Sequence, residues 1–257
     1  MNYGLYMSAA GMLNNMHRQD VTSNNLSNVE TTGFKRDLTS FIQRPPEALA
    51  SGRFDLSHQM MDRLGGGSWV GPSRSDLAPG PLQETSDPLN LAIEGEGFFV
   101  VQDERDGEMV SRLTRDGRLK IDPQGRLTTS TSDRPVLSTQ DTPIVVDPTQ
   151  PLHIDERGVV QQGGMEVGQL RLAQVTDPRE VRPVGKGLFS VEANVLEQAG
   201  QGGGLVRQGF VEQSNVDPIK EMQQMIEATR AINHAGTLIS YHDQILDGAV
   251  NVLGRVA

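Results

Sequence analysis

A strict seven-residue repeat near the C-terminus constrains this chain more than any other feature. Five apolar residues recur at that interval without interruption: Met225, Ile232, Ile239, Leu246 and Leu253. The spacing is typical of a helix that packs one apolar stripe against another helix. Asp217 and Pro218 precede the repeat as a helix cap and a first helical residue. A companion row is smaller and more polar: Met222, Thr229, Gly236, Asp243 and Val250.

A second helix is predicted over residues 3–28. One narrow apolar face follows the four-three-four spacing of a helix, with Leu13 beside it and Leu26 further along: Leu5, Ala9, Met12 and Met16. The other half of this helix is rich in asparagine. The string NNLSNVETTGFKR (24–36) then predicts a helix end, with Gly33 free to take a positive φ.

Neither terminal helix has a partner close to it in the sequence. Burying a Leu, Ile or Met side chain contributes roughly 1.5–3 kcal/mol, whereas ordering the backbone costs roughly 1–2 kcal/mol per residue. We therefore expect the two helices to pair as a coiled coil. Even this pair leaves an apolar edge uncovered, so both ends are predicted to be largely disordered until other copies cover them.

The region between the helices predicts short strands. Its turn signals lie at Asp116-Gly117, 123–125, 155–158 and 162–164. The predicted fold class is α+β, with a mostly antiparallel β domain inserted between paired terminal helices. The predicted divisions are residues 1–36 and 205–257 for the helical core domain, 37–88 for a linker with a few strands, and 89–204 for the β domain.

Composition excludes several kinds of chemistry. A net charge of -10 argues against binding of nucleic acid, and the absence of cysteine excludes disulfides and thiolate metal sites. Gly95 to Gly97 lack the spacing of a phosphate-binding loop and predict a tight turn. The acids between Asp103 and Glu108 do not match a calcium loop and predict a solvated hairpin tip. We predict no catalytic residue, cofactor, metal or small-molecule substrate.

Four strings, in order, resemble the flagellar basal-body rod and hook family of bacteria. They are NNLSNVETTGFKR (24–36), LAIEGEGFFVVQ (91–102), LTRDGRLKIDPQGRL (113–127) and GFVEQSNVDPIKEMQQMIEATRA (209–231). The strings NVETTGFKR and IEGEGFF are closer to the distal rod branch. The string DLAPGPLQETSDPLNLAI favours the proximal branch. Ile232 departs from the aromatic residue that is usual at this position, and Glu30 from a small or amide residue.

The resemblance implies a structural subunit of the basal-body rod that polymerises through its terminal helices. It implies a paired-helix domain lining a tube, with the β domain outside it. It also implies export through the flagellar type III apparatus without a cleaved signal peptide, and a location in the basal body across the periplasm. The implied partners are further copies, neighbouring rod and hook subunits, the export apparatus and surrounding ring proteins.

The residues expected to bind neighbouring subunits are those of the apolar stripes and of the N-terminal signature. They are Leu5, Met12, Met16, Asn24, Asn25, Leu26, Asn28, Gly33, Phe34, Met222, Met225, Ile232, Ile239, Leu246, Val250 and Leu253. Capping of a helix end is an equal alternative for the asparagines. An alternative function is a secreted β-rich adhesin with a coiled-coil stalk, and a third is a cell-wall hydrolase, which has no support beyond scattered carboxylates.

Overall fold

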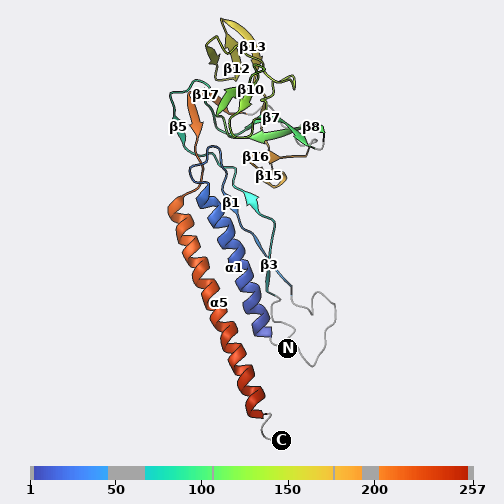
Figure 1. The fold of residues 1–257 in the computed structure, drawn as a ribbon, viewed down its shortest axis with the longest axis vertical. Helices are drawn as coiled ribbons and strands as arrows, with labels where there is room; N and C mark the ends of the chain where they lie inside the picture. Colours follow the sequence, from blue (N-terminus) through green and yellow to red (C-terminus); the bar gives the residue numbers. More distant parts are fainter. Residues whose placement is uncertain (1–2, 46–66, 106, 176, 193–202, 254–257) are drawn as a thin grey trace. The chain divides into compact units, whose positions relative to one another are not determined.

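The computed structural model describes residues 3–45, 67–105, 107–175, 177–192 and 203–253 (Figure 1). The chain divides into two compact units. Unit 1 comprises residues 1–26, 38–73 and 218–257, and unit 2 comprises residues 27–37 and 74–217.

Unit 1 is built on two long helices, α1 (Tyr3–Ser27) and α5 (Pro218–Leu253). The helix α1 ends one residue before the predicted limit of residue 28, where the signature string begins to favour a turn. The helix α5 begins at Pro218, as Asp217 and Pro218 predict. The unit also contains the antiparallel strands β2 (Phe41–Gln43) and β3 (Ser68–Val70). They lie within the segment that was expected to be a linker.

Unit 2 is almost entirely β structure. Its strands are β4 (Arg74–Ser75), β5 (Leu82–Glu84), β6 (Leu91–Glu94), β7 (Phe98–Arg105), β8 (Glu108–Thr114), β9 (Leu119–Ile121), β10 (Leu127–Thr129), β11 (Leu152–Ile154), β12 (Val159–Gln162), β13 (Met165–Gln169), β14 (Leu172–Ala173), β15 (Arg182–Gly185), β16 (Leu188–Ser190), β17 (Leu205–Gln208) and β18 (Phe210–Glu212). A 3₁₀ turn, η1 (Pro178–Glu180), precedes β15. A short strand, β1 (Asp37–Leu38), lies at the boundary between the units.

Every pair of strands in unit 2 whose register is defined is antiparallel. The largest sheet has the order β14-β7-β8-β16-β15, and a second has the order β11-β12-β13. Two-stranded ribbons are formed by β9 with β10, β6 with β17 and β5 with β18. The predicted turns at 123–125, 155–158 and 162–164 are confirmed, since they join β9 to β10, β11 to β12 and β12 to β13.

The core of unit 2 follows the alternation of side chains along β7. Phe99 and Val101 point into one buried cluster, whereas Phe98 and Val100 point into another. In the second cluster the ring of Phe98 meets the ring of Phe189 edge to face, with the centroids 5.7 Å apart. The first half of β7, residues 98–101, is therefore buried on both faces, which explains why these four residues are all apolar.

The fold class is confirmed as α+β, with one helix near each end of the chain and an antiparallel β region between them (Figure 1). The division into units differs from the predicted domains. Residues 27–37 and 205–217 group with the β strands rather than with the helices. The reason is that β17 and β18 form ladders with β6 and β5, and that the segment 27–37 is hydrogen-bonded to the residues that follow β18.

Candidate subunit-interaction surface

The half-buried face of α5 contains the predicted heptad row. Met225, Ile232 and Ile239 are all partly buried, whereas Leu246 is 40% exposed. The side chains of Val250 and Leu253 lie outside the described residues.

The companion row of this face is not the predicted one. Met222, Thr229 and Asp243 are exposed, whereas Gly236 is half-buried. The row that is buried or half-buried lies one residue earlier: Glu221, Ala228, Ala235 and His242. Ala228 is fully buried, so the small side chains of this row let another element approach closely. This row lies four residues before each heptad position, whereas the row named from the sequence lies three residues before it.

Three contacts show that α1 and α5 run antiparallel. Asn25 Nδ2 donates to Glu221 Oε2 across 3.3 Å, and Arg18 Nη2 lies 3.8 Å from Glu227 Oε2. At the other end, a Cβ atom added to Gly4 would lie 3.0 Å from His242 Nε2. Residue numbers rise along α1 as they fall along α5, which fixes both the direction and the register of the pair (Figure 1).

The apolar stripe predicted for α1 lies beside these contacts rather than among them. The contacting positions Gly4, Arg18 and Asn25 are separated by 14 and 7 residues, which are whole heptads, so small and polar side chains lie towards α5. Leu5 and Met12 are one residue further round the helix and are half-buried, and Met16 is 45% exposed. Leu26 is also half-buried.

Unit 1 therefore exposes large apolar side chains on both helices. On α1 these are Tyr6, Leu13 and Met16, and on α5 they are Ile219, Met222, Ile226, Leu238, Tyr241, Ile245 and Leu246. Ile245 is 67% exposed and Leu13 is 64% exposed. We call this set the helix-pair surface. An exposed apolar set of this extent is typical of a site that binds another protein.

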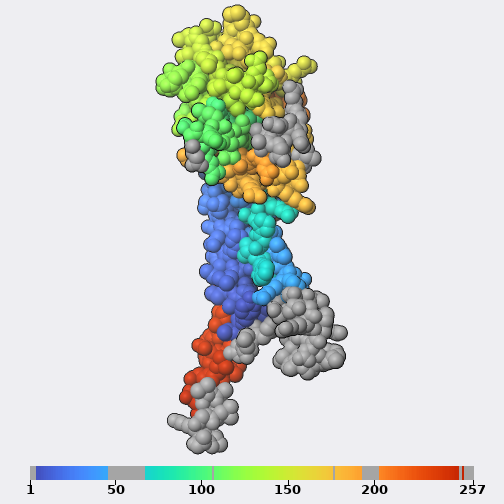
Figure 2. Space-filling view, turned by 90° about the vertical axis from the view of Figure 1, so that its right-hand side faces the viewer, coloured from blue at the N-terminus to red at the C-terminus, as the bar shows by residue number. Residues whose placement is uncertain are grey.

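The ribbon of β2 and β3 packs on α1 and adds further exposed apolar residues. Asn14 Nδ2 donates to Ser68 O at 3.0 Å and to Ser68 Oγ at 2.6 Å. Arg44 Nη1 donates to Tyr6 Oη at 2.9 Å, and its guanidinium lies 5.6 Å from the centroid of the Trp69 ring. Figure 2 shows the residues of this ribbon along the surface of α1. The exposed members are Phe41, Ile42, Trp69 and Val70.

The signature residues have different environments. Asn24 is exposed, whereas Asn25 is 1% exposed and Gly33 is buried. Asn28 Oδ1 accepts a hydrogen bond from Thr31 Oγ1, and Phe34 is half-buried. Gly33 has a φ of 69°, which confirms the predicted left-handed conformation. Asn25 and Gly33 thus make contacts within the chain, and their role between subunits stays a prediction.

Sequence reasoning missed a buried cluster of charges in unit 2. Lys35 Nζ donates to Glu212 Oε1 at 2.6 Å, and Arg115 Nη1 donates to Glu212 Oε2 at 2.8 Å. The exposed fractions of the three side chains are 0%, 2% and 1% for Lys35, Arg115 and Glu212. Burial lowers the pKa of Lys35, although Glu212 acts in the opposite direction. We call these three residues the Glu212 cluster. Each lies within one of the strings that resemble the rod family, which was the available signal.

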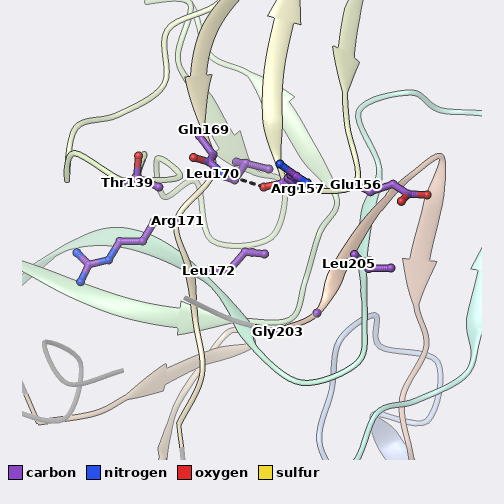
Figure 3. Close-up of a pocket in the computed structure, with 10 residues that line it drawn as sticks. Thr139, Glu156, Arg157, Gln169, Leu170, Arg171, Leu172, Gly203 and Leu205 are labelled. Atoms are coloured by element: carbon purple, nitrogen blue, oxygen red, sulfur yellow. Dashed lines mark hydrogen bonds between the residues drawn. The ribbon is translucent and has the colours of Figure 1, made fainter. Parts of the chain in front are cut away.

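A shallow pocket in unit 2 does not have the character of a ligand site. It has a volume of about 320 Å³ and is lined by residues that include Glu156, Arg171 and Leu205 (Figure 3). Arg171 is paired with Asp141, and Glu156 accepts from Arg207 Nη1 at 2.7 Å. Gln169 Nε2 donates to the backbone oxygen of Arg157 at 3.1 Å. Arg171 and Glu156 at this rim therefore each have a partner of opposite charge.

Two further observations concern metals and membranes. Among the residues that the structure describes, no three His, Asp or Glu side chains lie close enough together to hold a metal ion. Neither described helix has a window long and apolar enough to cross a membrane.

Family models match three parts of the chain. The model of the flagella basal body rod protein matches residues 5–35, and the D1 domain of the flagellar hook protein FlgE/F/G matches residues 92–162. The C-terminal model of the flagellar basal body rod FlgEFG protein matches residues 207–252. The first and third models cover much of the described helices, and the second covers much of the β structure.

Whole-length relatives agree with these matches. The flagellar basal-body rod protein FlgF of Caulobacter vibrioides is 30% identical over 256 residues, which cover 100% of both chains. FlgG of Borreliella burgdorferi is 29% identical over 270 residues, covering 99% of this chain and 100% of the relative. The hook protein FlgE of Helicobacter pylori is 32% identical over 124 residues, which are 47% of this chain and 17% of FlgE. With its terminal helices and an antiparallel β region between them, this chain belongs to the family of flagellar basal-body rod proteins.

Proposed function

We propose that this chain is a structural subunit of the flagellar basal-body rod and that it polymerises through the helix-pair surface. The observation that supports this most directly is the set of large apolar side chains that the pairing of α1 with α5 leaves exposed. Burying each of them against a neighbouring copy would contribute roughly 1.5–3 kcal/mol. Several such contacts offset the cost of ordering and immobilising a subunit.

The pairing of α1 with α5 as a coiled coil is part of the same proposal. The half-buried rows of α5 alternate by three and four residues, as Glu221, Met225 and Ala228 illustrate. The antiparallel contacts of Asn25 and Arg18 support it. In this arrangement Met225, Ile232 and Ile239 stabilise the pair, whereas the helix-pair surface binds neighbouring copies.

The environment of the subunit follows from the family. We propose that its neighbours are further copies and the adjoining rod and hook subunits, that ring proteins surround it, and that the rod it forms spans the periplasm. Export by the flagellar apparatus without cleavage of a signal peptide belongs to this proposal. The adhesin alternative has no support among the relatives described above, which are rod and hook proteins.

The experiment compares charged substitutions at two kinds of position in α5. Ile226 is 53% exposed and belongs to the helix-pair surface, so Ile226→Asp is expected to abolish rod formation while the purified chain retains its β structure. Asn233→Asp adds the same charge at an exposed polar position without changing the size of the side chain, and rods are expected to form normally. Rod formation is scored by electron microscopy of isolated basal bodies from a strain that expresses only the variant.

Substitutions in the seam between α1 and α5, by which we mean the half-buried heptad positions Met225, Ile232 and Ile239, act differently. Ile232→Asp and Ile239→Asp are expected to prevent polymerisation by separating α5 from α1, while unit 2 stays folded. Normal rods from both the Ile226 and the Ile232 variants would refute the proposal that α5 forms the polymer interface.

A further inference from the structure

The segment that comprises β17, β18 and the residues leading to α5 is the centre of a hydrogen-bond network in unit 2. We name residues 205–217 the return segment and residues 27–37 the signature segment. Gly33 N donates to Glu212 O at 2.8 Å, and Arg36 N donates to Asn215 Oδ1 at 2.8 Å. The return segment thus binds the backbone of the signature segment at two points.

The return segment also holds a third stretch of chain. Gln213 N donates to Pro81 O at 2.9 Å, and Asn215 Nδ2 donates to Asp76 O at 2.9 Å and to Ala78 O at 3.0 Å. Lys35 Nζ donates to the same Ala78 oxygen at 2.8 Å. Residues 76–81 therefore contact the signature segment and the return segment together.

The charges of the Glu212 cluster do not play equivalent parts. The carboxylate of Glu212 accepts from Lys35, Arg115 and the amide of Gly80, the last at 2.8 Å. Arg115 additionally donates to Ile93 O at 3.3 Å and to Gly95 O at 2.9 Å, so it is held by β6 and the turn after it. One buried anion thus serves two buried cations that come from distant parts of the sequence.

The consequences of removing either segment therefore differ. Without the signature segment, Glu212 and Arg115 remain as a pair of opposite charge. Without the return segment, Lys35 and Arg115 would be two buried cations with no carboxylate between them. A buried charge that has lost its partner costs several kcal/mol. The second state is consequently far less favourable than the first.

We propose that unit 2 closes in a fixed order, in which the signature segment docks only after the return segment has placed Glu212 beside Arg115. The signature segment directly follows α1 in the chain, and the return segment directly precedes α5. The end of α1 therefore becomes anchored to folded β structure only in a chain that already extends to the beginning of α5. This inference concerns the folding of the subunit itself and does not depend on the polymerisation proposed above.

The test is amide hydrogen exchange, read by mass spectrometry, on the full chain and three variants. Glu212→Gln preserves the size of the side chain but removes the anion. It is expected to accelerate exchange at least about tenfold in both the signature segment and the return segment. Lys35→Met removes one cation and is expected to accelerate exchange in the signature segment alone, because Glu212 retains Arg115. Glu166→Gln makes the same chemical change at an exposed carboxylate of β13, outside both segments, and is expected to alter neither segment.

The contrast between the first two variants decides the outcome. Equal acceleration of the return segment in Lys35→Met and Glu212→Gln would overturn the order, as would unchanged exchange in Glu212→Gln. If Glu212→Gln also exposes β7 and β8, the proposal stands only if Lys35→Met leaves both β7 and the return segment protected. Trypsin cleavage after Arg36, which precedes β1, gives an independent measure of release of the signature segment.

Discussion

Asn25 on α1 donates an amide hydrogen to the buried carboxylate of Glu221 on α5, across 3.3 Å and 196 positions of sequence. Both side chains are 1% exposed. Polar groups buried between helices fix register, because a shifted pairing would leave them without hydrogen bonds. This contact therefore explains how an antiparallel pair whose facing rows mix small, polar and apolar side chains can have one alignment.

The register can be tested by cross-linking, with no background from native cysteine because the chain has none. Arg18→Cys combined with Glu227→Cys is expected to be joined efficiently by a short bis-maleimide, since the native side chains are 3.8 Å apart. Arg18→Cys combined with His234→Cys moves one thiol by a heptad along α5 and should react poorly. Comparable yields from the two pairs would contradict the alignment.

Gly33, the one glycine in the sequence of the signature segment, is predicted to tolerate replacement poorly. A Cβ atom there would lie 2.5 Å from both Arg115 C and Asp116 N, at a φ of 69°. Gly33→Ala should lower the free energy of unfolding of unit 2 by more than the roughly 1–2 kcal/mol that the left-handed backbone alone costs. Urea denaturation measures this directly.

Gly107 provides the matched control for that substitution. It also has a positive φ, 84°, but nothing lies within 4 Å of its added Cβ atom. Gly107→Ala should therefore show only the backbone effect, of roughly 1–2 kcal/mol. If both variants lose the same stability, the close approach of Gly33 to residues 115 and 116 contributes nothing.

The free energy of unfolding of unit 2 is predicted to depend on pH in the alkaline range because of Lys35. Burial lowers its pKa in the folded state below the ordinary 10.5. Between these two values the unfolded chain holds a proton that the folded chain has released, so the free energy of unfolding rises with pH in this window. Lys35→Met should lack that rise. The difference between the two urea-denaturation curves, from neutral pH to 10.5, isolates the contribution of Lys35, and a difference of opposite sign would refute it.

The helices are predicted to be the least protected part of a dilute subunit. Their seam is half-buried rather than buried along much of its length, and the helix-pair surface lacks its partners before assembly. Amide exchange in residues 220–250 should therefore be fast in dilute solution and slow in assembled rods. Strong protection of these residues at high dilution would mean that the pair of helices is stable by itself.

The sequence predicted the elements of this fold better than it predicted their contacts. The heptad row of α5 was visible because its members are large and apolar. The buried or half-buried row beside it escaped notice because Ala228 and Ala235 have small side chains, which contribute little to a pattern of hydrophobicity. The turns were readable because glycine and its neighbours specify them locally.

The Glu212 cluster was not predictable in the same way. Lys35 and Glu212 are separated by 177 positions, and Arg115 and Glu212 by 97. A charged residue in a polar string is normally solvated, so only the tertiary structure shows that these three are not. The sequence also does not separate the exposed residues of the helix-pair surface from the residues of the seam, because both sets are apolar. Only their burial in the structure separates them.

One buried anion that neutralises two cations also limits how the family can diverge. A change of Glu212 to a neutral residue would strand both Lys35 and Arg115, whereas loss of either cation leaves a balanced pair. Substitutions at position 212 should therefore be found across relatives only together with compensating substitutions at positions 35 and 115, whereas position 35 or position 115 can change alone.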